Sequence, residues 1–166
     1  MKVKKLHPDA VIPQYAKPGD SGFDLVAVDD VSIKPGETKL VPIGLAFEIP
    51  EGYEIQIRPR SGVTSNTKLR VQFGTVDSGY RGEVKVTVDN ISQIQYSSQP
   101  RFSAPILSGD KDFNITKPTK CEVLKVEKGM RIAQGVIAPV VKVEFEETEE
   151  LSSTERGSGG FGHTGY

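Results

Sequence analysis

Prolines and glycines interrupt this chain throughout its length, and their spacing restricts the fold more than any other feature. The 166 residues include 11 prolines and 17 glycines. These residues leave little room for long helices. Short runs of β-branched and aliphatic residues recur between the interruptions, a spacing that is typical of an all-β sandwich or barrel. The length fits one domain with a sizeable core.

The expected elements are short and closely spaced. A single short helix is expected near Ser61–Lys68, with Ser61 as its N-terminal cap. The predicted strands are Met1–Leu6, Gly22–Val28, Val31–Ile33, Thr38–Ile43, Leu45–Ile49, Tyr53–Arg58, Leu69–Phe73, Glu83–Val88, Cys121–Val126, Arg131–Pro139 and Val141–Phe145.

Charge and cysteine content exclude several classes of function. The formal net charge of −1 gives no strong field that would recruit nucleic acid or a membrane surface. Cys121 has no second cysteine to pair with, and His7 and His163 add too few ligands for a metal cluster. No apolar run approaches the roughly 20 residues that span a bilayer. With a free thiol and no signal peptide, we expect a cytoplasmic protein.

Two segments differ in composition from the predicted barrel. Residues 90–118 are polar and rich in turn residues, so we interpret them as an inserted excursion from the sheet. Glu144–Glu150 is acidic and reads as a solvated linker. The predicted organisation is a barrel over residues 1–145, followed by a linker and a flexible glycine-rich tail over 146–166.

The tail, Arg156–Tyr166, reads RGSGGFGHTGY and admits two interpretations. Amides of successive glycines can surround an anion, while Arg156 matches phosphate oxygens and Phe161 offers a face for a base. The alternative is a disordered terminus without a ligand.

Two further segments carry groups suited to phosphate or sugar. In RPRSGVTSNTK (Arg58–Lys68), Arg60 directly precedes the start of the expected helix, where free amides suit phosphate. In GTVDSGYRGEVKV (Gly74–Val86), Asp77 and Tyr80 flank a predicted hairpin bend. The carboxylate could activate water and the ring could pack against a sugar. The alternative interpretation assigns neither segment a binding role: the first is an exposed turn with basic residues, and the second is an ordinary hairpin.

Five segments in order resemble the five motifs of the trimeric dUTP pyrophosphatases, or dUTPases. They are PGDSGFDLVA (Pro18–Ala27), RSGV (Arg60–Val63), GTVDSGYRG (Gly74–Gly82), GMRIAQGVI (Gly129–Ile137) and RGSGGFGHTG (Arg156–Gly165). The resemblance implies a distorted jelly-roll β-barrel in a homotrimer, with active sites between subunits and each tail closing over a neighbour's pocket. It also implies hydrolysis of dUTP to dUMP and pyrophosphate with Mg²⁺, which limits uracil in DNA and supplies dUMP for dTMP synthesis.

The resemblance assigns roles to individual residues. Asp77 would activate water, Tyr80 would exclude a ribose 2′-OH, and the main chain around Val71–Gly74 would read the uracil edge. Asp24 would support the site and the subunit interface. Mg²⁺ would be held by the substrate phosphates and water, with no direct side-chain ligand. The implied catalytic residues are Asp77, Gln134 and Arg60, and the implied substrate-binding residues are Arg60, Ser61, Gly62, Gly74, Val76, Asp77, Tyr80, Gln134, Arg156, Gly157, Ser158, Phe161, Gly162 and Thr164.

The chain departs from the family pattern at three places. Val71 stands where many relatives carry asparagine, so recognition of uracil would rely more on backbone. His163 stands where serine is usual. The segment after Asn90 is longer than usual and resembles those of bacteriophage dUTPases that contact proteins such as repressors, which would place a phage-encoded enzyme in a bacterial host cell.

Two other functions compete with this interpretation. The related dCTP deaminases carry a catalytic glutamate ten residues beyond the aspartate that corresponds to Asp77, and here that position holds Thr87. A regulatory protein that binds a partner through residues 90–118, with or without catalysis, is the second alternative.

Overall fold

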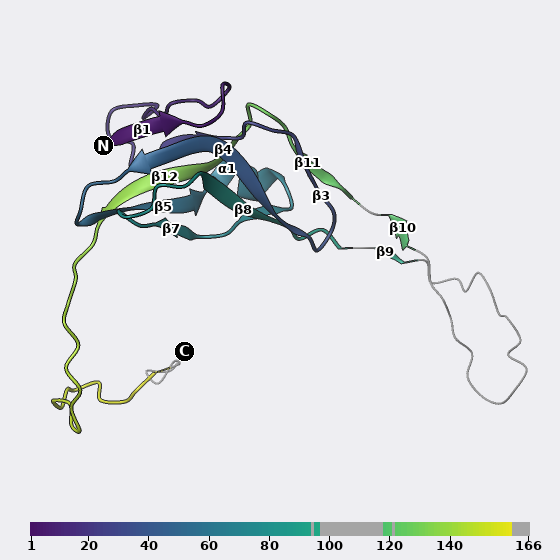
Figure 1. Ribbon diagram of the computed structural model, residues 1–166. Helices are drawn as coiled ribbons and strands as arrows, with labels where there is room; N and C mark the ends of the chain where they lie inside the picture. Colours follow the sequence, from purple (N-terminus) through teal and green to yellow (C-terminus); the bar gives the residue numbers. More distant parts are fainter. Residues whose placement is uncertain (94, 97–117, 121, 161–166) are drawn as a thin grey trace, which may run out of the picture.

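Two four-stranded antiparallel sheets form the body of the protein (Figure 1). The computed structural model describes residues 1–93, 95–96, 118–120 and 122–160. The first sheet has the order β1 (Lys2–Lys5), β4 (Thr38–Glu48), β8 (Val84–Asn90), β6 (Leu69–Val71). The second has the order β2 (Phe23–Val26), β12 (Arg131–Pro139), β5 (Tyr53–Pro59), β7 (Gly74–Val76). Two small ribbons, β3 (Val31–Ile33) with β11 (Leu124–Val126) and β9 (Gln95–Tyr96) with β10 (Pro118–Lys120), complete the strands of the described chain.

The core lies between the two sheets, where apolar side chains from both sheets are buried. Along β8, Val84, Val86 and Val88 are buried and the residues between them are more exposed. Ile55 and Ile57 of β5 face them from the second sheet as part of the same apolar cluster. This period of two is the pattern of a sheet with one buried face. The all-β jelly-roll prediction is therefore confirmed.

The sequence predicted several strands closely and divided one of them wrongly. Val31–Ile33 and Arg131–Pro139 are strands with the predicted bounds. Thr38–Ile43 and Leu45–Ile49 are not separate strands but parts of β4. Gly44 adopts φ +65° there, and the pairing of β4 with β8 shifts register between Pro42 and Leu45. Gly44 therefore marks a bulge inside one strand.

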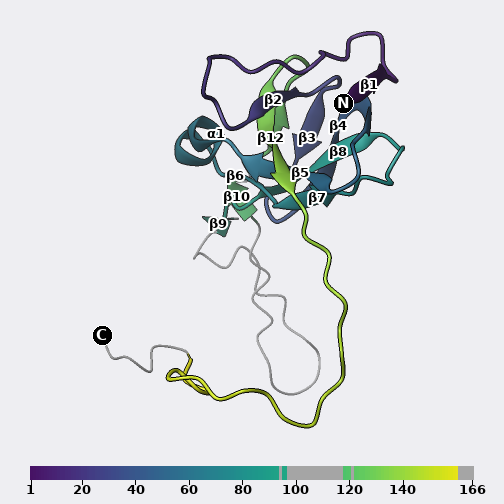
Figure 2. The ribbon, with the colours of Figure 1, turned by 90° about the vertical axis from the view of Figure 1, so that its left-hand side faces the viewer.

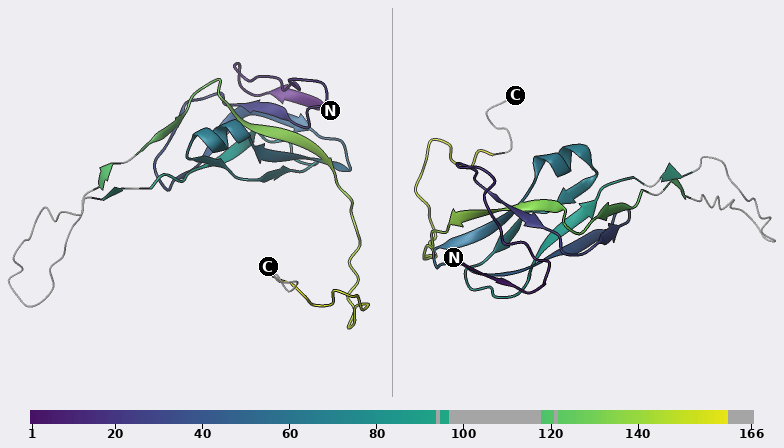
Figure 3. Two further views of the ribbon diagram at one scale, coloured as in Figure 1. Left: turned by 180° about the vertical axis from the view of Figure 1, so that it is seen from behind. Right: turned by 90° about the horizontal axis from the view of Figure 1, so that it is seen from above.

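The strand predicted at Val141–Phe145 is wrong for the chain by itself. Val141, Val143 and Phe145 are 86%, 64% and 96% exposed, and this segment pairs with no strand among the described residues. It leaves the barrel after Pro139 as extended chain, at the end opposite the β9–β10 ribbon (Figures 1 and 3). The alternating sequence is suited to pairing at a sheet edge, and this segment makes no such pairing among the described residues.

The helix α1 (Ser61–Asn66) confirms the predicted short helix, although it ends earlier. Arg60, not Ser61, is the N-terminal cap residue, and no side chain caps the helix. Ser61 is instead the first helical residue, which leaves its hydroxyl free of a capping role. No helix in the described ranges has the length and apolar character needed to cross a membrane.

Most of the predicted insertion, residues 97–117, lies outside the described residues, but its base is well anchored. The strands β9 and β10 pair antiparallel there. Asn90 at the end of β8 is 1% exposed, and its side-chain amide donates to the carbonyl oxygens of Ile33 (2.8 Å) and Glu122 (3.0 Å). Its Oδ1 accepts from the amide of Ser92 at 2.9 Å. The buried Asn90 side chain thus links the segment before the insertion to the segment after it, and links both to β3.

Replacing Asn90 by alanine is expected to lower the free energy of unfolding by about 2 kcal/mol or more. The reason is that buried backbone groups would lose their hydrogen-bond partners. Urea denaturation at one fixed protein concentration measures the change. Asn66→Ala, at an exposed position of α1, is the matched control and should cost about 0.5 kcal/mol or less. A cost for Asn90→Ala as small as that of the control would show that the base of the insertion does not depend on this amide.

The loop between β1 and β2 is held against the barrel by an ion pair. Lys128 Nζ lies 2.6 Å from Asp9 Oδ2, and this hydrogen bond lowers the pKa of the Asp9 carboxyl below its usual value. The contribution to stability is therefore present at neutral pH and is lost as the pH falls through that pKa. Because both groups are exposed, the contribution is small. The contact matters mainly because the same loop lines one of the two clefts described below.

Candidate active site

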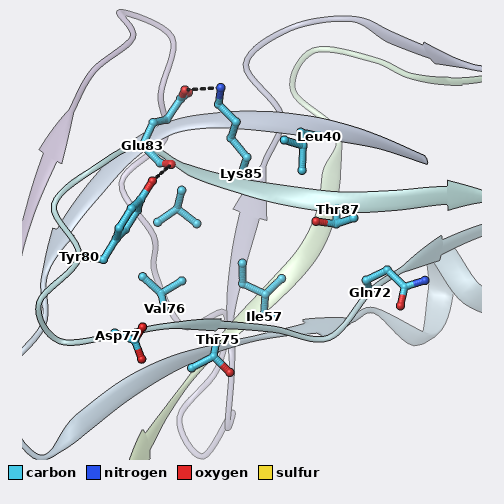
Figure 4. A pocket seen from close by; sticks show the side chains of 12 residues that line it. Leu40, Ile57, Gln72, Thr75, Val76, Asp77, Tyr80, Glu83, Lys85 and Thr87 are labelled. Atoms are coloured by element: carbon cyan, nitrogen blue, oxygen red, sulfur yellow. Dashed lines mark hydrogen bonds and ion pairs between the residues drawn. The ribbon is translucent and has the colours of Figure 1, made fainter. Parts of the chain in front are cut away.

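The larger cleft opens between the two sheets and has a volume of about 530 Å³ (Figure 4). We call it the tyrosine cleft. Tyr80 and Asp77 lie at one end and Gln72 at the other (Figure 4). The cleft is lined by Leu40, Ile57, Gln72, Gly74, Thr75, Val76, Asp77, Tyr80, Glu83, Val84, Lys85 and Thr87.

A tight turn after β7 brings Asp77 and Tyr80 to this cleft. The amide of Tyr80 donates to the carbonyl of Asp77 at 3.0 Å, and the Tyr80 hydroxyl donates to the carbonyl of Glu83 at 3.0 Å. Gly82 allows the ring to fold back, because a Cβ at that position would lie 2.4 Å from the Tyr80 hydroxyl oxygen. Tyr80 is 47% exposed, so one side of a held ring remains open to a ligand.

The segment Gly74–Val86 was predicted to be a hairpin, and this is wrong. The strand β7 pairs with β5 in the second sheet, whereas β8 pairs with β4 and β6 in the first. The turn therefore crosses from one sheet to the other instead of closing a ladder. The link from Val71 to Gly74 makes the same crossing, from β6 to β7. These two crossings leave the tyrosine cleft open between the sheets, and Asp77 lies at its edge.

The Asp77 carboxylate is available for chemistry. The residue is exposed, and no side-chain hydrogen bond or ion pair between described residues engages it. The other carboxylate of the cleft is committed, since Glu83 Oε1 accepts from the Gly44 amide (3.2 Å) and Oε2 lies 3.5 Å from Lys85 Nζ. Thr87, at the position of the deaminase glutamate, also lines the cleft and carries no carboxylate.

The second cleft, which we call the arginine cleft, has a volume of about 350 Å³ and shares no lining residue with the first. Its walls come from the loop before β2, the start of α1 and the first half of β12. It is lined by Ala16, Asp20, Ser21, Gly22, Asp24, Arg60, Ser61, Gly62, Arg131 and Gln134.

Asp24 organises the charges of the arginine cleft. Its Oδ1 lies 2.9 Å from Arg60 Nε, and its Oδ2 lies 3.2 Å from Arg131 Nη1. Arg60 also donates through Nη1 to the carbonyl of Arg131 at 2.9 Å. One half-buried carboxylate therefore holds two guanidinium groups at the same opening, where they can receive an anion.

Gln134 completes this cleft from the middle of β12. Its Nε2 donates to the carbonyl of Pro59 at 3.0 Å. A Cβ at Gly22 would lie 2.8 Å from Gln134 Oε1, so glycine at position 22 makes room for this amide. The fixed amide leaves its oxygen beside the arginines as an acceptor for water or a protonated group.

The tail residues that the structure describes line neither cleft. Arg156 and Ser158 are exposed and line neither cleft, and Arg156 Nε donates to the carbonyl of Gly159 at 3.0 Å. Gly157 adopts φ +52° in a turn, where its own amide donates to the carbonyl of Thr154. Figure 2 shows this segment well away from the barrel. Phe161, Gly162, His163 and Thr164 lie outside the described residues.

The predicted site residues thus fall into three groups: one in the tyrosine cleft, one in the arginine cleft and one in the tail. Gly74, Val76, Asp77 and Tyr80 meet in the tyrosine cleft. Asp24, Arg60, Ser61, Gly62 and Gln134 meet in the arginine cleft. No motif in the sequence indicated a separate role for Arg131, Glu83, Leu40 or Gln72. Arg131 stands inside the GMRIAQGVI segment, and Gln72 interrupts the predicted apolar strand Leu69–Phe73, so each left a weak signal.

The arginine cleft is suited to a metal ion that is already bound to phosphate oxygens and water, and not to a free ion. No cluster of three or more His, Cys, Asp or Glu side chains that could hold a metal occurs among the described residues. Both oxygens of Asp24 are engaged by arginines, and Asp20 Oδ2 accepts from the amide of Lys17. Mg²⁺ prefers phosphate oxygens and water to a cage of side chains, so a Mg²⁺–triphosphate fits this opening better than the free ion.

Comparison with known proteins agrees with this geometry. The family model for dUTPase matches residues 9–109 and 106–165. A deoxyuridine 5'-triphosphate nucleotidohydrolase from Nautilia profundicola is 47% identical over 167 residues, which cover 99% of this chain and 98% of that protein. The Staphylococcus bacteriophage 80alpha dUTPase, solved with dUPNHPP, aligns with a TM-score of 0.81 and 30% identity over 99% of this chain and 98% of that one. A mutant dUTPase from phage phi11 of S. aureus, solved with a structural Mg(II) ion, aligns with a TM-score of 0.69 and 26% identity over 90% and 96%.

Proposed function

This chain belongs to the dUTPase family, and on that premise we propose that it hydrolyses dUTP to dUMP and pyrophosphate. The observation that carries the proposal is that one turn delivers a free carboxylate, Asp77, and a fixed ring, Tyr80, to the same cleft. Such a cleft can hold a deoxyribose against the ring while the carboxylate reaches a water molecule near the phosphates. The reaction limits uracil incorporation into DNA and supplies dUMP for dTMP synthesis.

In the proposed mechanism Asp77 is the general base. It accepts a proton from a water molecule as the water oxygen bonds to the α-phosphorus of dUTP. The bond from that phosphorus to the α–β bridging oxygen breaks, and the electron pair leaves with pyrophosphate. An exposed, uncommitted carboxylate suits this role because it can hold and orient water without first breaking a contact. The tyrosine cleft supplies the orientation on which phosphoryl transfer mainly depends.

The arginine cleft supplies the charge that the triphosphate requires. Arg60 donates to phosphate oxygens, its guanidinium oriented by Asp24 at 2.9 Å, and Ser61 and Gly62 add hydroxyl and amide donors. Gln134 positions phosphate or the attacking water. Mg²⁺, when bound through the phosphates, neutralises part of their negative charge. These groups act by position and charge and form no covalent intermediate.

Two clefts that share no residue indicate that one chain does not complete a site. We propose a homotrimer in which the tyrosine cleft of one subunit meets the arginine cleft of another, and in which the tail of a subunit closes over a neighbour's nucleotide. The exposed apolar segment Val141–Phe145 supports this arrangement, because it needs a surface outside its own barrel.

Light scattering should accordingly give a mass near three chains, and subunits with different defects should complement one another. Mixing Asp77→Asn subunits with subunits that end at Glu155 should restore part of the activity, since some interfaces would combine an intact Asp77 with an intact tail. Each variant alone is the control. Confirmed mixed trimers with no recovered activity would mean that each chain completes its own site.

The ring of Tyr80 is expected to exclude ribose. Tyr80→Ala should bring the kcat/KM ratio of dUTP to UTP about tenfold or more closer to unity, because a missing ring leaves space for the 2′-OH. Tyr80→Phe keeps the ring and loses only the hydrogen bond to Glu83, so it should retain the discrimination. Steady-state kinetics with both nucleotides measures the ratios. Full discrimination in Tyr80→Ala would place the selectivity elsewhere.

Deamination of dCTP is the enzymatic alternative, and the cleft disfavours it. The position of the deaminase glutamate holds Thr87, and the nearby Glu83 is committed to Gly44 and Lys85. No carboxylate of the described cleft is therefore free to act there apart from Asp77.

We further propose a cytoplasmic location, where nucleotide pools are consumed, and a protein partner of the repressor type at residues 90–118. The base formed by Asn90 and the β9–β10 ribbon supports the second idea, because it anchors the chain before and after the insertion. A pull-down that compares the full chain with one lacking residues 97–117 tests this role. Equal capture of proteins by both forms would exclude a partner at this segment.

A further inference from the structure

Gln72 lines the tyrosine cleft at the end away from Tyr80 and Asp77, where a base would lie if its sugar packed on the Tyr80 ring. Figure 4 shows its amide at the opposite end from Tyr80 and Asp77, with Thr87, Leu40 and Ile57 between them. A deoxyribose on the Tyr80 ring would direct its base along this apolar stretch toward Gln72. The Val71 side chain, by contrast, belongs to a residue that is 7% exposed and packed in the core, so that side chain offers nothing to the base.

The orientation of the Gln72 amide is fixed by Asp89. Gln72 Nε2 donates to Asp89 Oδ2, while Asp89 Oδ1 accepts from the Thr38 hydroxyl at 2.7 Å. Arg70, the register partner of Asp89, donates from Nη1 to the carbonyls of Thr64, Thr67 and Leu69, so other partners already engage that atom. A carboxylate only accepts hydrogen bonds, and therefore the NH₂ group of Gln72 must face Asp89.

This leaves Oε1 as the acceptor that the side chain can offer to a ligand. Uracil presents a donor, N3–H, on its pairing edge, whereas cytosine presents an unprotonated N3. An acceptor held in place forms a hydrogen bond with the first and meets a lone pair on the second. A site built to bond one group discriminates strongly against an analogue that lacks it.

We propose that Gln72 is a specificity-determining residue that reads N3–H of uracil through Oε1, and that Asp89 is the positioning residue that holds it. The inference rests on the proposed function, since it assumes that the nucleotide lies in the tyrosine cleft. It assigns to a side chain part of the recognition that the backbone of Val71–Gly74 would otherwise carry alone. It also gives Asp89 a role that no motif of the sequence indicated.

The test compares kcat/KM for dUTP and dCTP in Gln72→Met, which keeps the length of the side chain and removes its hydrogen-bonding groups. The kcat/KM for dUTP should fall about tenfold, mainly through KM, and the ratio of dUTP to dCTP should fall by a similar factor. Gln14→Met, at an exposed position that lines neither cleft, is the matched control and should keep wild-type values. An unchanged ratio in Gln72→Met would overturn the proposal. Failure of the wild-type protein to hydrolyse dUTP would instead refute the proposed function.

Asp89 is tested by its dependence on Gln72. Asp89→Asn can donate as well as accept, which lets the Gln72 amide turn over, so the ratio of dUTP to dCTP should fall while kcat for dUTP changes little. In the double variant Gln72→Met/Asp89→Asn the ratio should be no lower than in Gln72→Met alone, because Asp89 acts only through Gln72. Additive losses would show that Asp89 supports the fold and does not position the amide.

Discussion

Replacing Asp77 by asparagine is expected to slow the hydrolysis of dUTP by about 10²- to 10⁴-fold, the usual scale for loss of a general base. The substitution keeps the size of the side chain and removes its capacity to accept the proton of water. Because Asp77 is exposed and engages no other described side chain, neither the turn with Tyr80 nor the stability of the barrel should change. Affinity for a non-hydrolysable dUTP analogue should therefore remain close to that of the wild type.

Single-turnover rates, together with calorimetric binding of the analogue, separate the two effects. Asp29→Asn, at an exposed turn position that lines neither cleft, is the matched control and should retain full activity. An Asp77→Asn enzyme within a few-fold of the wild-type rate would remove Asp77 from the role of base.

Ending the chain at Glu155 should reduce turnover by about 10- to 150-fold or more. In the proposed closed state Arg156 donates charge-assisted hydrogen bonds to phosphate, which contribute about 1.5–3 kcal/mol each. The glycines around it make ordering costly, at about 1–2 kcal/mol of backbone entropy per residue. A triphosphate can offset this cost by offering several charged contacts and a base for Phe161 to stack on. A monophosphate offers fewer, so the tail should open again on dUMP.

The truncated protein should keep its fold and its oligomeric mass, because the removed residues that the structure describes line neither cleft and belong to no strand. Circular dichroism and light scattering check this. Arg156→Gln in the full chain isolates the charge and should account for a large part of the loss. A second reporter is available because the chain has no tryptophan. Emission of Phe161→Trp should be quenched by the non-hydrolysable analogue with Mg²⁺ and much less by dUMP. Full activity without the tail would return these residues to the interpretation of a terminus without a ligand.

The sequence predicted most of the strands because their burial pattern depends on local alternation. The bounds of β12 follow from a mostly apolar run between a turn and a proline, and those of β3 from the turn that ends it. Local pattern could not show that Gly44 sits in a bulge, since that depends on the register of β4 against β8. It also could not show that Val141–Phe145 pairs with no strand among the described residues, because pairing is a property of the assembled sheets.

For the candidate site, the motifs identified the functional residues but not which of them lie in the same cleft. Asp77 and Tyr80 could be paired from the sequence because they share one turn. The link among Asp24, Arg60 and Arg131 joins β2, α1 and β12, so it appears only when these elements meet. The contact of Gln72 with Asp89 likewise depends on the pairing of β6 with β8. The division into two clefts is also a tertiary feature. Because of this division, the proposed site needs a second subunit to bring the two clefts together.

Release of pyrophosphate should be measured from dUTP, dTTP, dCTP and UTP, each at the same concentration with Mg²⁺. We expect rapid release from dUTP and little from the other three. Tyr80 disfavours the ribose of UTP, and Gln72 reads the N3–H that cytosine lacks. Thymine carries the same N3–H as uracil, so the low rate with dTTP is expected from membership of the dUTPase family. Release from all four nucleotides at similar rates, or none from dUTP, would contradict this expectation.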